Sequence, residues 1–405
     1  MTTADFADTP TPISTPVSAG IVASLVGFTS SFAVVLTGLR AVGASPAEAA
    51  SGLSALCVTQ ALGMMWLSRR YRQPITLAWS TPGAALLAGA GVVTGEWPAA
   101  VGAFVTVGVL AVVTGLWPGL GALVSKIPVP LAQAMLAGVL LPLCAAPVIA
   151  FADSPALIAP VAVVWLVVLR FSPRWAVPAA FVAAAVVIAA DLIGSGTSIA
   201  VSDLIPGIDW TVPHWTWQAT IGIAVPLYIV TMASQNIPGT TVMASFGFRI
   251  PWRASMVTTG TGTVLGAFAG GHTINLAAIS AALSANPAAH PDPKRRWIAA
   301  FSAGCSYLVL ALLATALATL VAAAPAGVVE TVAGLALLGT LAASLFGALE
   351  HASDRESTVL TFLVAASGLT FAGIGSAFWA LVVGLLVRSI LRRQSPANTA
   401  SDETG

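Results

Sequence analysis

The sequence predicts an all-α polytopic membrane protein with about fourteen transmembrane segments, arranged as two inverted repeats of seven. Three observations support this prediction: the composition is apolar, hydrophobic stretches of spanning length follow one another closely, and the basic residues fall on one side of the resulting topology. Of the 405 residues, 57% are hydrophobic and 8% are charged, and the mean hydropathy is +0.93. The formal net charge of +1, without a long basic run, argues against a nucleic-acid partner.

The first repeat is expected over residues 17–193. Residues 1–16 carry no Lys or Arg and therefore lack the charged start of a cleavable signal, so we expect them to form a disordered cytoplasmic tail. A bilayer core of about 30 Å needs roughly 20 apolar residues per helix. The apolar stretches that meet or approach this length are 17–39, 46–67, 74–90, 98–117, 128–150, 155–171 and 175–193.

The second repeat is expected over residues 218–391. It follows a more polar extracytoplasmic linker, 194–217, whose Trp residues suit the membrane interface. Its apolar stretches are 218–236, 252–269, 272–285, 297–322, 327–349, 357–372 and 375–391. A cytoplasmic tail is expected over residues 392–405.

The basic residues support both the segment count and the orientation. With both termini in the cytoplasm, all of the 16 Lys and Arg residues except Arg40 fall on the cytoplasmic side. Because each half then has an odd number of segments, the second half enters the membrane from the opposite face. This is the condition for an inverted repeat.

The third segment, residues 74–89, is too interrupted to be an ordinary spanning helix. The sequence predicts an extended piece at 75–78, a helix N-cap at Ser80 or Thr81, and Pro82 in the first helical turn. Backbone of this kind is tolerated at membrane depth only where protein or a water-filled cavity surrounds it. We therefore expect this segment to line a cavity.

The tenth segment, within residues 270–285, is the counterpart of this stretch. Ile75-Thr-Leu-Ala78 parallels Ile274-Asn-Leu-Ala277 at a spacing of 199 residues. Interrupted segments at corresponding places in two halves indicate the substrate site of a transporter. Two facing helix N-termini also favour an anion, because each offers unpaired N–H groups and the positive end of a dipole.

The predicted substrate site combines these two segments with polar patches of the first and eighth. Its residues are Phe28, Thr29, Ser30, Trp79, Ser80, Thr81, Gly83, Gln235, Asn236, His272, Thr273 and Asn275. One alternative is that Ser80, Thr81 and Asn275 serve only as helix caps. Another is that the hydroxyls of residues 29–31 return hydrogen bonds to their own backbone.

The eighth segment is expected to end at Pro238. Gln235 and Asn236 then lie near its cytoplasmic end, where their amides either bind a carboxylate or cap exposed carbonyls.

The candidates for proton coupling are His272, Glu330 and Glu350. His272 is the one histidine that this segmentation places within the membrane, where an ionisable group is costly and usually functional. The alternative is a neutral histidine bonded to a backbone carbonyl. The two glutamates lie at helix ends, and the charged run 350–356 is interpreted as a solvated cytoplasmic loop.

We expect neither a metal site nor a cofactor. The three cysteines lie far apart in apolar segments, which indicates neither a disulfide framework nor a metal site. The sequence has no His-Glu-x-x-His zinc motif, no Walker-type phosphate loop and no Asp-rich diphosphate motif, which argues against a membrane enzyme or an ATP-driven pump.

In combination, three stretches resemble the benzoate:proton symporter family of bacteria. They are Gln73-Pro-Ile-Thr-Leu-Ala-Trp-Ser-Thr-Pro-Gly-Ala-Ala85, Gly270-Gly-His-Thr-Ile-Asn-Leu-Ala-Ala-Ile279 and Ala289-His-Pro-Asp-Pro-Lys-Arg-Arg-Trp297. The resemblance implies the fold of nucleobase permeases and sulfate-type anion transporters. In that fold, segments 1–4 and 8–11 form a core domain that moves as an elevator against a gate domain of segments 5–7 and 12–14, often within a homodimer.

The same resemblance implies import of benzoate or a related aromatic carboxylate, together with protons, across the bacterial inner membrane. Proton-coupled nucleobase permeases carry acids in segments 8 and 10, where this sequence has Gln235 and Ala277 or Ala278. A fixed carboxylate would repel an anionic substrate by several kcal/mol at low effective dielectric. We therefore expect the proton to travel on His272 or on the substrate as the neutral acid.

In the predicted complex, the substrate ring lies against Trp79 and Phe28. The alternatives are a carrier of another organic or inorganic anion on the same fold, a channel, and a membrane enzyme. Uptake that saturates and collapses with a protonophore distinguishes a proton-coupled carrier from a channel.

Overall fold

The computed structural model describes residues 13–91, 95–124, 126–196, 200, 204–350 and 354–393. Of the predicted tails, 1–16 and 392–405, the structure describes residues 13–16 and 392–393, which adjoin or belong to helices. The rest of both tails lies outside the described ranges. By length and composition, eight helices in the described ranges could cross a membrane, and two shorter apolar helices accompany them. The protein is a helical, multi-pass membrane protein as predicted, whereas the count of fourteen spans stays a prediction.

The first half of the chain is helical except for one short strand. Its elements are α1 (Ser14–Thr29), α2 (Phe32–Ala41), α3 (Pro46–Tyr71), β1 (Leu77–Trp79), α4 (Thr81–Ala90), α5 (Glu96–Leu116), α6 (Pro118–Val124), α7 (Val129–Asp153), α8 (Pro155–Phe171) and α9 (Pro173–Ser195). The predicted third segment is therefore a strand that leads into a ten-residue half-helix.

The second half repeats this arrangement. Its elements are α10 (Trp217–Ala219), the π-helical turn η2 (Thr220–Ala224), α11 (Val225–Thr231), the π-helical turn η3 (Met232–Asn236), α12 (Ile237–Ser245), α13 (Trp252–Ala267), β2 (Ile274–Leu276), α14 (Ile279–Ala285), the 3₁₀ turn η4 (Pro293–Arg295), α15 (Trp297–Ala322), α16 (Val328–Leu349), α17 (Arg355–Ala366) and α18 (Ser376–Arg393). The predicted tenth segment is again a strand followed by a half-helix.

Pro238 does not end the eighth segment, so that prediction is wrong. The helical path continues from Trp217 to Ser245. Pro238 lies in the first turn of α12, directly after the wider turn η3. A proline inside a continuing membrane helix is tolerated where a local π-helical adjustment satisfies the backbone groups that it frees. Gln235 and Asn236 consequently lie within a long helix, not at its end.

The contacts between helices show the inverted repeat. α3 packs against α15, and α5 packs against α13. In the repeat of seven segments, α3 corresponds to α13 and α5 corresponds to α15, so the two pairs are equivalent. The pairs α2–α4 and α12–α14, and the pairs α8–α9 and α17–α18, correspond in the same way. A pseudo-two-fold axis relates the halves, as in transporters with inverted repeats.

The two strands locate this axis. β1 and β2 are antiparallel, and Leu77 lies opposite Leu276. These two leucines are also equivalent in the 199-residue repeat of the sequence. A residue can face its own repeat equivalent only where the symmetry axis passes between them, so the axis runs through the Leu77–Leu276 pair.

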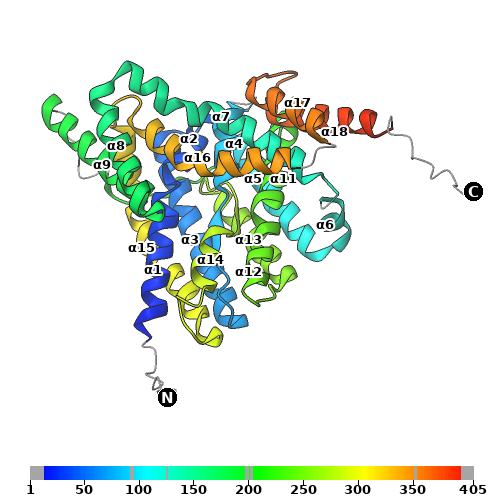
Figure 1. Ribbon diagram of the computed structural model, residues 1–405, viewed down its shortest axis with the longest axis horizontal. Coiled ribbons are helices and arrows are strands. Elements are labelled where there is room, and N and C mark those ends of the chain that lie inside the picture. The colour runs from blue at the N-terminus through cyan, green and yellow to red at the C-terminus, as the bar shows by residue number, and fades with distance from the viewer. Residues whose placement is uncertain are drawn as a thin grey trace, which may run out of the picture.

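The helices form two packed groups. α7, α8, α9, α16, α17 and α18 contact one another and occupy the upper part of the view in Figure 1, whereas α1, α3, α12, α13 and α14 extend below them. α2 contacts both groups, because it packs against α1 and α3 and also against α16, whereas α4 and α11 contact α7 and α18 of the upper group. One contact of α2 with the upper group is aromatic, since Phe32 meets Phe181 of α9 edge to face at 4.7 Å between ring centroids.

Glycines bring the backbones close where α3 crosses the second interrupted segment. A Cβ at Gly52 would lie 2.4 Å from the carbonyl oxygen of Gly270. Gly270 itself has a φ of +89°, in the left-handed region, and a Cβ there would lie 3.0 Å from the Glu48 carbonyl oxygen. This close approach holds β2 against α3, in the middle of the lower group.

Candidate functional site

The two strands satisfy each other's backbone inside the protein. Beyond the paired residues of β1 and β2, the Ser80 N–H donates to the Thr273 carbonyl and the Ala277 N–H donates to the Thr76 carbonyl, both at 3.0 Å. Asn236 covers the outer edge of β2, because its Oδ1 accepts from the Leu276 N–H at 2.9 Å. Extended backbone at membrane depth is stable here because its polar groups are paired within protein.

The N-cap of the half-helix α4 is Ser80, one of the two caps that the sequence predicts. The Ser80 Oγ accepts from the Gly83 N–H at 3.1 Å and also from the Thr231 hydroxyl at 3.0 Å. With its amide oriented to satisfy both of its polar atoms, Asn275 accepts from the Ser80 N–H at 3.0 Å. Asn275 thus lies in β2 beside the start of α4 and does not cap α14, whose N-cap, Ala278, provides no side-chain bond.

The first segment is broken beside these strands. α1 ends at Thr29 and α2 starts at Phe32, and the hydroxyls of Ser30 and Ser31 both donate to the Gly27 carbonyl, at 3.0 and 3.2 Å. This is the backbone return that the sequence left open as an alternative. The Ser31 Oγ also accepts from the Trp79 indole N–H at 2.9 Å, which ties the break to β1.

The eighth segment widens at the corresponding place. The five residues of η3, Met232–Asn236, form a π-helical turn, in which the regular hydrogen-bond ladder is interrupted. The interrupted parts of segments 1, 3, 8 and 10 therefore lie around one region of the molecule.

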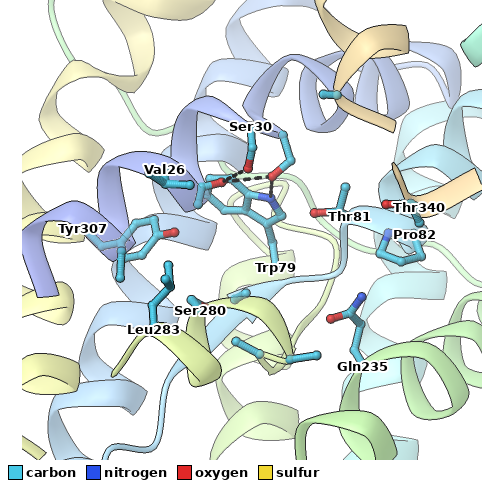
Figure 2. Close-up of a pocket in the computed structure, with 17 residues that line it drawn as sticks. Val26, Ser30, Trp79, Thr81, Pro82, Gln235, Ser280, Leu283, Tyr307 and Thr340 are labelled. Atoms are coloured by element: carbon cyan, nitrogen blue, oxygen red, sulfur yellow. Dashed lines mark hydrogen bonds between the residues drawn. The ribbon is translucent and has the colours of Figure 1, made fainter. Parts of the chain in front are cut away.

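A cavity of about 160 Å³ lies where these interruptions meet. Figure 2 shows the seventeen residues of its wall. They are Ala23, Val26, Gly27, Ser30, Ser31, Ala78, Trp79, Thr81, Pro82, Gln235, Ala277, Ala278, Ser280, Leu283, Tyr307, Ala336 and Thr340. The wall includes residues from the first turns of both half-helices, and α16 supplies two residues from the other packed group.

The wall carries polar groups that have no partner. Within the described part of the chain, the structure gives no hydrogen-bond partner to the side chains of Thr81, Gln235, Ser280, Tyr307 and Thr340. In Figure 2 the Tyr307 hydroxyl and the Gln235 amide point toward the cavity from opposite sides. None of the described wall residues is charged. The site therefore offers neutral hydrogen-bonding groups to a ligand.

Aromatic rings form one side of the site. The Trp79 ring meets the Tyr307 ring edge to face at 5.9 Å and the Phe28 ring at 5.7 Å. Phe28 is buried behind Trp79 and stacks on Phe32 at 5.2 Å. An apolar cavity of about 150 Å³ accommodates benzene in another protein, so a space of about 160 Å³ suits one substituted ring.

Four of the twelve predicted site residues lie in the cavity wall: Ser30, Trp79, Thr81 and Gln235. Ser80, Asn236, Thr273 and Asn275 lie behind the wall, where they hold the strands and the start of α4. Phe28 supports Trp79, the Thr29 hydroxyl donates to the Leu25 carbonyl, and Gly83 packs beside Ser80 and Leu227.

The predicted proton-coupling residues lie elsewhere. His272 is fully buried outside the cavity wall, where its Nδ1 accepts from the Thr273 N–H at 2.6 Å and its ring meets Phe104. Its Nε2 has no hydrogen-bond partner among the residues that the structure describes. Glu330 is exposed and caps α16 by accepting from the Gly327 N–H at 3.1 Å. Glu350 is exposed at the other end of α16.

The predicted site omits several wall residues. Ser31 belongs to the polar patch that was recognised, and Ser280 belongs to the tenth segment, which was expected to form part of the site. Tyr307 and Thr340 come from helices in which no site residue is expected. Tyr307 is the single tyrosine of the 26-residue apolar helix α15. A lone phenol in such a helix is the sequence signal that could have identified it as a site residue. Thr340 gives no comparable signal, because isolated threonines are common in apolar helices and bond to their own backbone.

Comparison with known proteins identifies relatives along almost the whole chain. The model of the family described as benzoate membrane transport protein matches residues 10–390. Inner membrane protein YdcO of Escherichia coli is 36% identical over 368 residues, which cover 90% of this chain and 93% of that protein. A benzoate membrane transport protein of Acinetobacter baylyi is 28% identical over 375 residues, 92% of this chain and 94% of that protein.

Solved structures share the fold. The overall structure of SLC26A9 matches with a TM-score of 0.64 and 14% identity, over 94% of this chain and 65% of that one. The transmembrane domain of the cyanobacterial bicarbonate transporter BicA matches with a TM-score of 0.57 and 16% identity, over 93% and 96%. This chain thus spans about two thirds of SLC26A9 and nearly all of the BicA domain.

Proposed function

Because the chain belongs to the benzoate membrane transport protein family, we propose that it imports benzoate or a closely related aromatic carboxylate together with protons. The family consists of membrane transporters, so the protein is not an enzyme. We place it in the bacterial inner membrane, with both termini in the cytoplasm. The curated inner membrane relative and the distribution of basic residues support this location.

The observation that carries the proposal is the cavity between the two half-helices. Its volume suits one aromatic ring, and its wall combines Trp79 and Tyr307 with unpartnered neutral polar groups. Burial of a ring of this size contributes about 1.5–3 kcal/mol. Hydrogen bonds from fixed neutral groups then select for a carboxyl group, because a hydrocarbon would leave them without partners.

We orient the substrate with its ring against Trp79 and its carboxyl group toward Thr81, Ser280 and Gln235. Thr81 and Ser280 lie in the first turns of α4 and α14. The N-terminal dipole of a helix favours a negatively charged group by about 0.3–1 kcal/mol. Ser80, Asn236 and Asn275 act indirectly in this arrangement, because they fix the two starts relative to each other.

We propose alternating access by an elevator movement of segments 1–4 and 8–11 against segments 5–7 and 12–14. The separate packing of the two helix groups supports this division. The wall residues Ala336 and Thr340 belong to α16, on the gate side, and the other wall residues belong to the core side. Movement of the core would therefore carry most of the site away from these two residues. A homodimer is compatible with the proposal.

A carrier of another organic or inorganic anion is the second candidate, and the fold shared with a bicarbonate transporter domain favours it. The test is uptake of labelled benzoate into proteoliposomes with an imposed pH gradient, in competition with salicylate, urate and sulfate. We expect saturable accumulation that benzoate and salicylate inhibit and that a protonophore abolishes. Inhibition by sulfate alone would refute an aromatic substrate, and uptake without saturation would indicate a channel.

A further inference from the structure

We propose that the substrate binds as the neutral carboxylic acid, paired with the Gln235 carboxamide, so that the coupled proton crosses the membrane on the substrate itself. This inference rests on the proposed function and identifies the proton carrier, which the family relationship leaves open. The carboxyl O–H bond stays intact during transport, and the proton passes to water after release on the cytoplasmic side. No residue of the protein has to change its protonation state.

Gln235 differs from the other unpartnered groups of the wall because it presents a donor and an acceptor side by side. Its side chain comes from η3, has no hydrogen-bond partner within the described residues, and points into the cavity (Figure 2). A carboxamide has an N–H₂ donor and a carbonyl acceptor in one plane. A carboxylic acid has the complementary pair, so the two groups can form two hydrogen bonds at once.

A carboxylate cannot make the same pair. An ionised carboxyl group only accepts, so one of its oxygens would receive the amide N–H while the other faced the amide oxygen. The hydroxyls of Thr81, Ser280 and Thr340 do not discriminate in this way, because a hydroxyl rotates to donate or to accept. Gln235 is therefore the wall residue that favours the protonated form.

The surroundings of Gln235 supply no countercharge for a carboxylate. Four elements contact η3, and their titratable groups are few. α11 carries Tyr228, and α7 carries Cys144 and, at its far end, Asp153. Neither α12 nor β2 carries a titratable group. Of the remaining elements of the wall, α15 carries Tyr307 and an exposed cysteine, and α16 carries Glu330 at its first turn. None of these groups is a cation at neutral pH, so an anion in the cavity would lose its hydration and gain no charged side chain as a partner, only the weak attraction of the helix N-termini.

The candidate proton carriers of the protein lie outside the cavity. His272 is fully buried behind the wall, and Glu330 and Glu350 are exposed at opposite ends of α16. Among the described residues of the cavity wall there is no carboxylic acid, so the substrate itself brings the carboxyl group into the cavity, with a pKa of about 4 by comparison with ordinary carboxyl groups.

The test measures equilibrium binding of labelled benzoate to the purified protein between about pH 5.5 and 7.5, a range above the pKa of the ligand. The neutral fraction of benzoate falls tenfold for each pH unit in this range, so we expect the apparent Kd to rise about tenfold per unit. Benzamide, a neutral analogue, should displace the label with little dependence on pH. Benzenesulfonate, which stays ionised, should not displace it.

The result that overturns the inference is a benzoate Kd that does not change with pH, or displacement by benzenesulfonate and not by benzamide. Either result leaves the proposed transport of aromatic carboxylates intact, whereas failure to bind benzoate at every pH refutes both. If both analogues compete, the pH dependence of the benzoate Kd decides.

The matched variants are Gln235→Leu and Gln133→Leu. Gln133 is a half-buried glutamine of α7 outside the cavity wall, so it controls for the loss of a buried amide as such. We expect Gln235→Leu to weaken benzamide binding more than tenfold and Gln133→Leu to leave it unchanged. Equal weakening in both variants would contradict a specific role for Gln235. The comparison of analogues on the unmodified protein needs neither variant to fold.

Discussion

The Ser80 hydroxyl joins two segments of the site, and its removal should therefore have a larger effect than the loss of an ordinary helix cap. Its oxygen accepts from the Gly83 N–H at 3.1 Å and from the Thr231 hydroxyl at 3.0 Å. Ser80 is fully buried, and Thr231 is 3% exposed. In Ser80→Ala, the start of α4 loses its cap and the Thr231 hydroxyl loses its acceptor in a place where water does not replace it.

These two losses set the expected magnitude. An N-cap contributes about 1 kcal/mol, and a buried polar group left unpaired costs about 1–3 kcal/mol. Ser80→Ala should therefore lower the free energy of unfolding by roughly 2–4 kcal/mol. Thr231→Val removes the donor but leaves the cap intact, so it should cost only about 1 kcal/mol.

A double-mutant cycle separates the two effects. In Ser80→Ala/Thr231→Val the unpaired hydroxyl is gone, so the double variant should be less destabilised than the sum of the single variants by about 1–3 kcal/mol. The assay is denaturant unfolding of each variant in the same detergent, with the slope of the transition checked for constancy. Additivity within about 0.5 kcal/mol would refute the reasoning, because it would mean that Ser80 and Thr231 do not share a bond.

Three further predictions concern the site and its support. Gly27→Ala would place a Cβ 2.7 Å from the Tyr307 hydroxyl oxygen, so we expect benzoate to bind at least tenfold more weakly. Adding Tyr307→Phe removes that oxygen and should restore part of the lost affinity. A double variant that binds benzoate no better than Gly27→Ala in a titration would contradict this. Gly52→Ala would place a Cβ 2.4 Å from the Gly270 carbonyl oxygen. Overpacking of this kind should destabilise the protein by about 1–3 kcal/mol and lower the denaturant midpoint of unfolding. An unchanged midpoint would argue against the close approach of these two backbones. His272→Gln should keep accumulation of labelled benzoate driven by a pH gradient, because the histidine lies outside the cavity wall; loss of accumulation at normal expression would restore it as the proton carrier.

The interrupted segments were predictable because their signals are local. Pro74 and Pro82 frame an extended piece and a helix start, and no neighbouring segment is needed to recognise them. The repeat of the same pattern at Ile274–Ala277 then located its partner. The strand, the Ser80 cap and the inverted relation of the halves agree with the structure for this reason.

The eighth segment shows where such local signals fail. Pro238 was expected to end a helix, yet a π-helical turn just before it allows the helix to continue. Whether a proline ends a helix or lies in a first turn depends on the packing around the preceding residues, and the order of residues does not contain that information. The position of Gln235 in the cavity wall follows from this turn.

The sequence by itself determined that the chain is a membrane protein of two inverted halves, and which two segments are broken. Apolar length, prolines and the placement of Arg and Lys express these properties along the chain. Only the tertiary structure decided which polar residues reach the cavity, because Tyr307 and Thr340 come from helices that chain folding brings to the interrupted pair. It also decided that His272 and Asn275 lie behind the cavity wall, because β2 and the residues just before it are packed against α3 and α13, which bury both side chains.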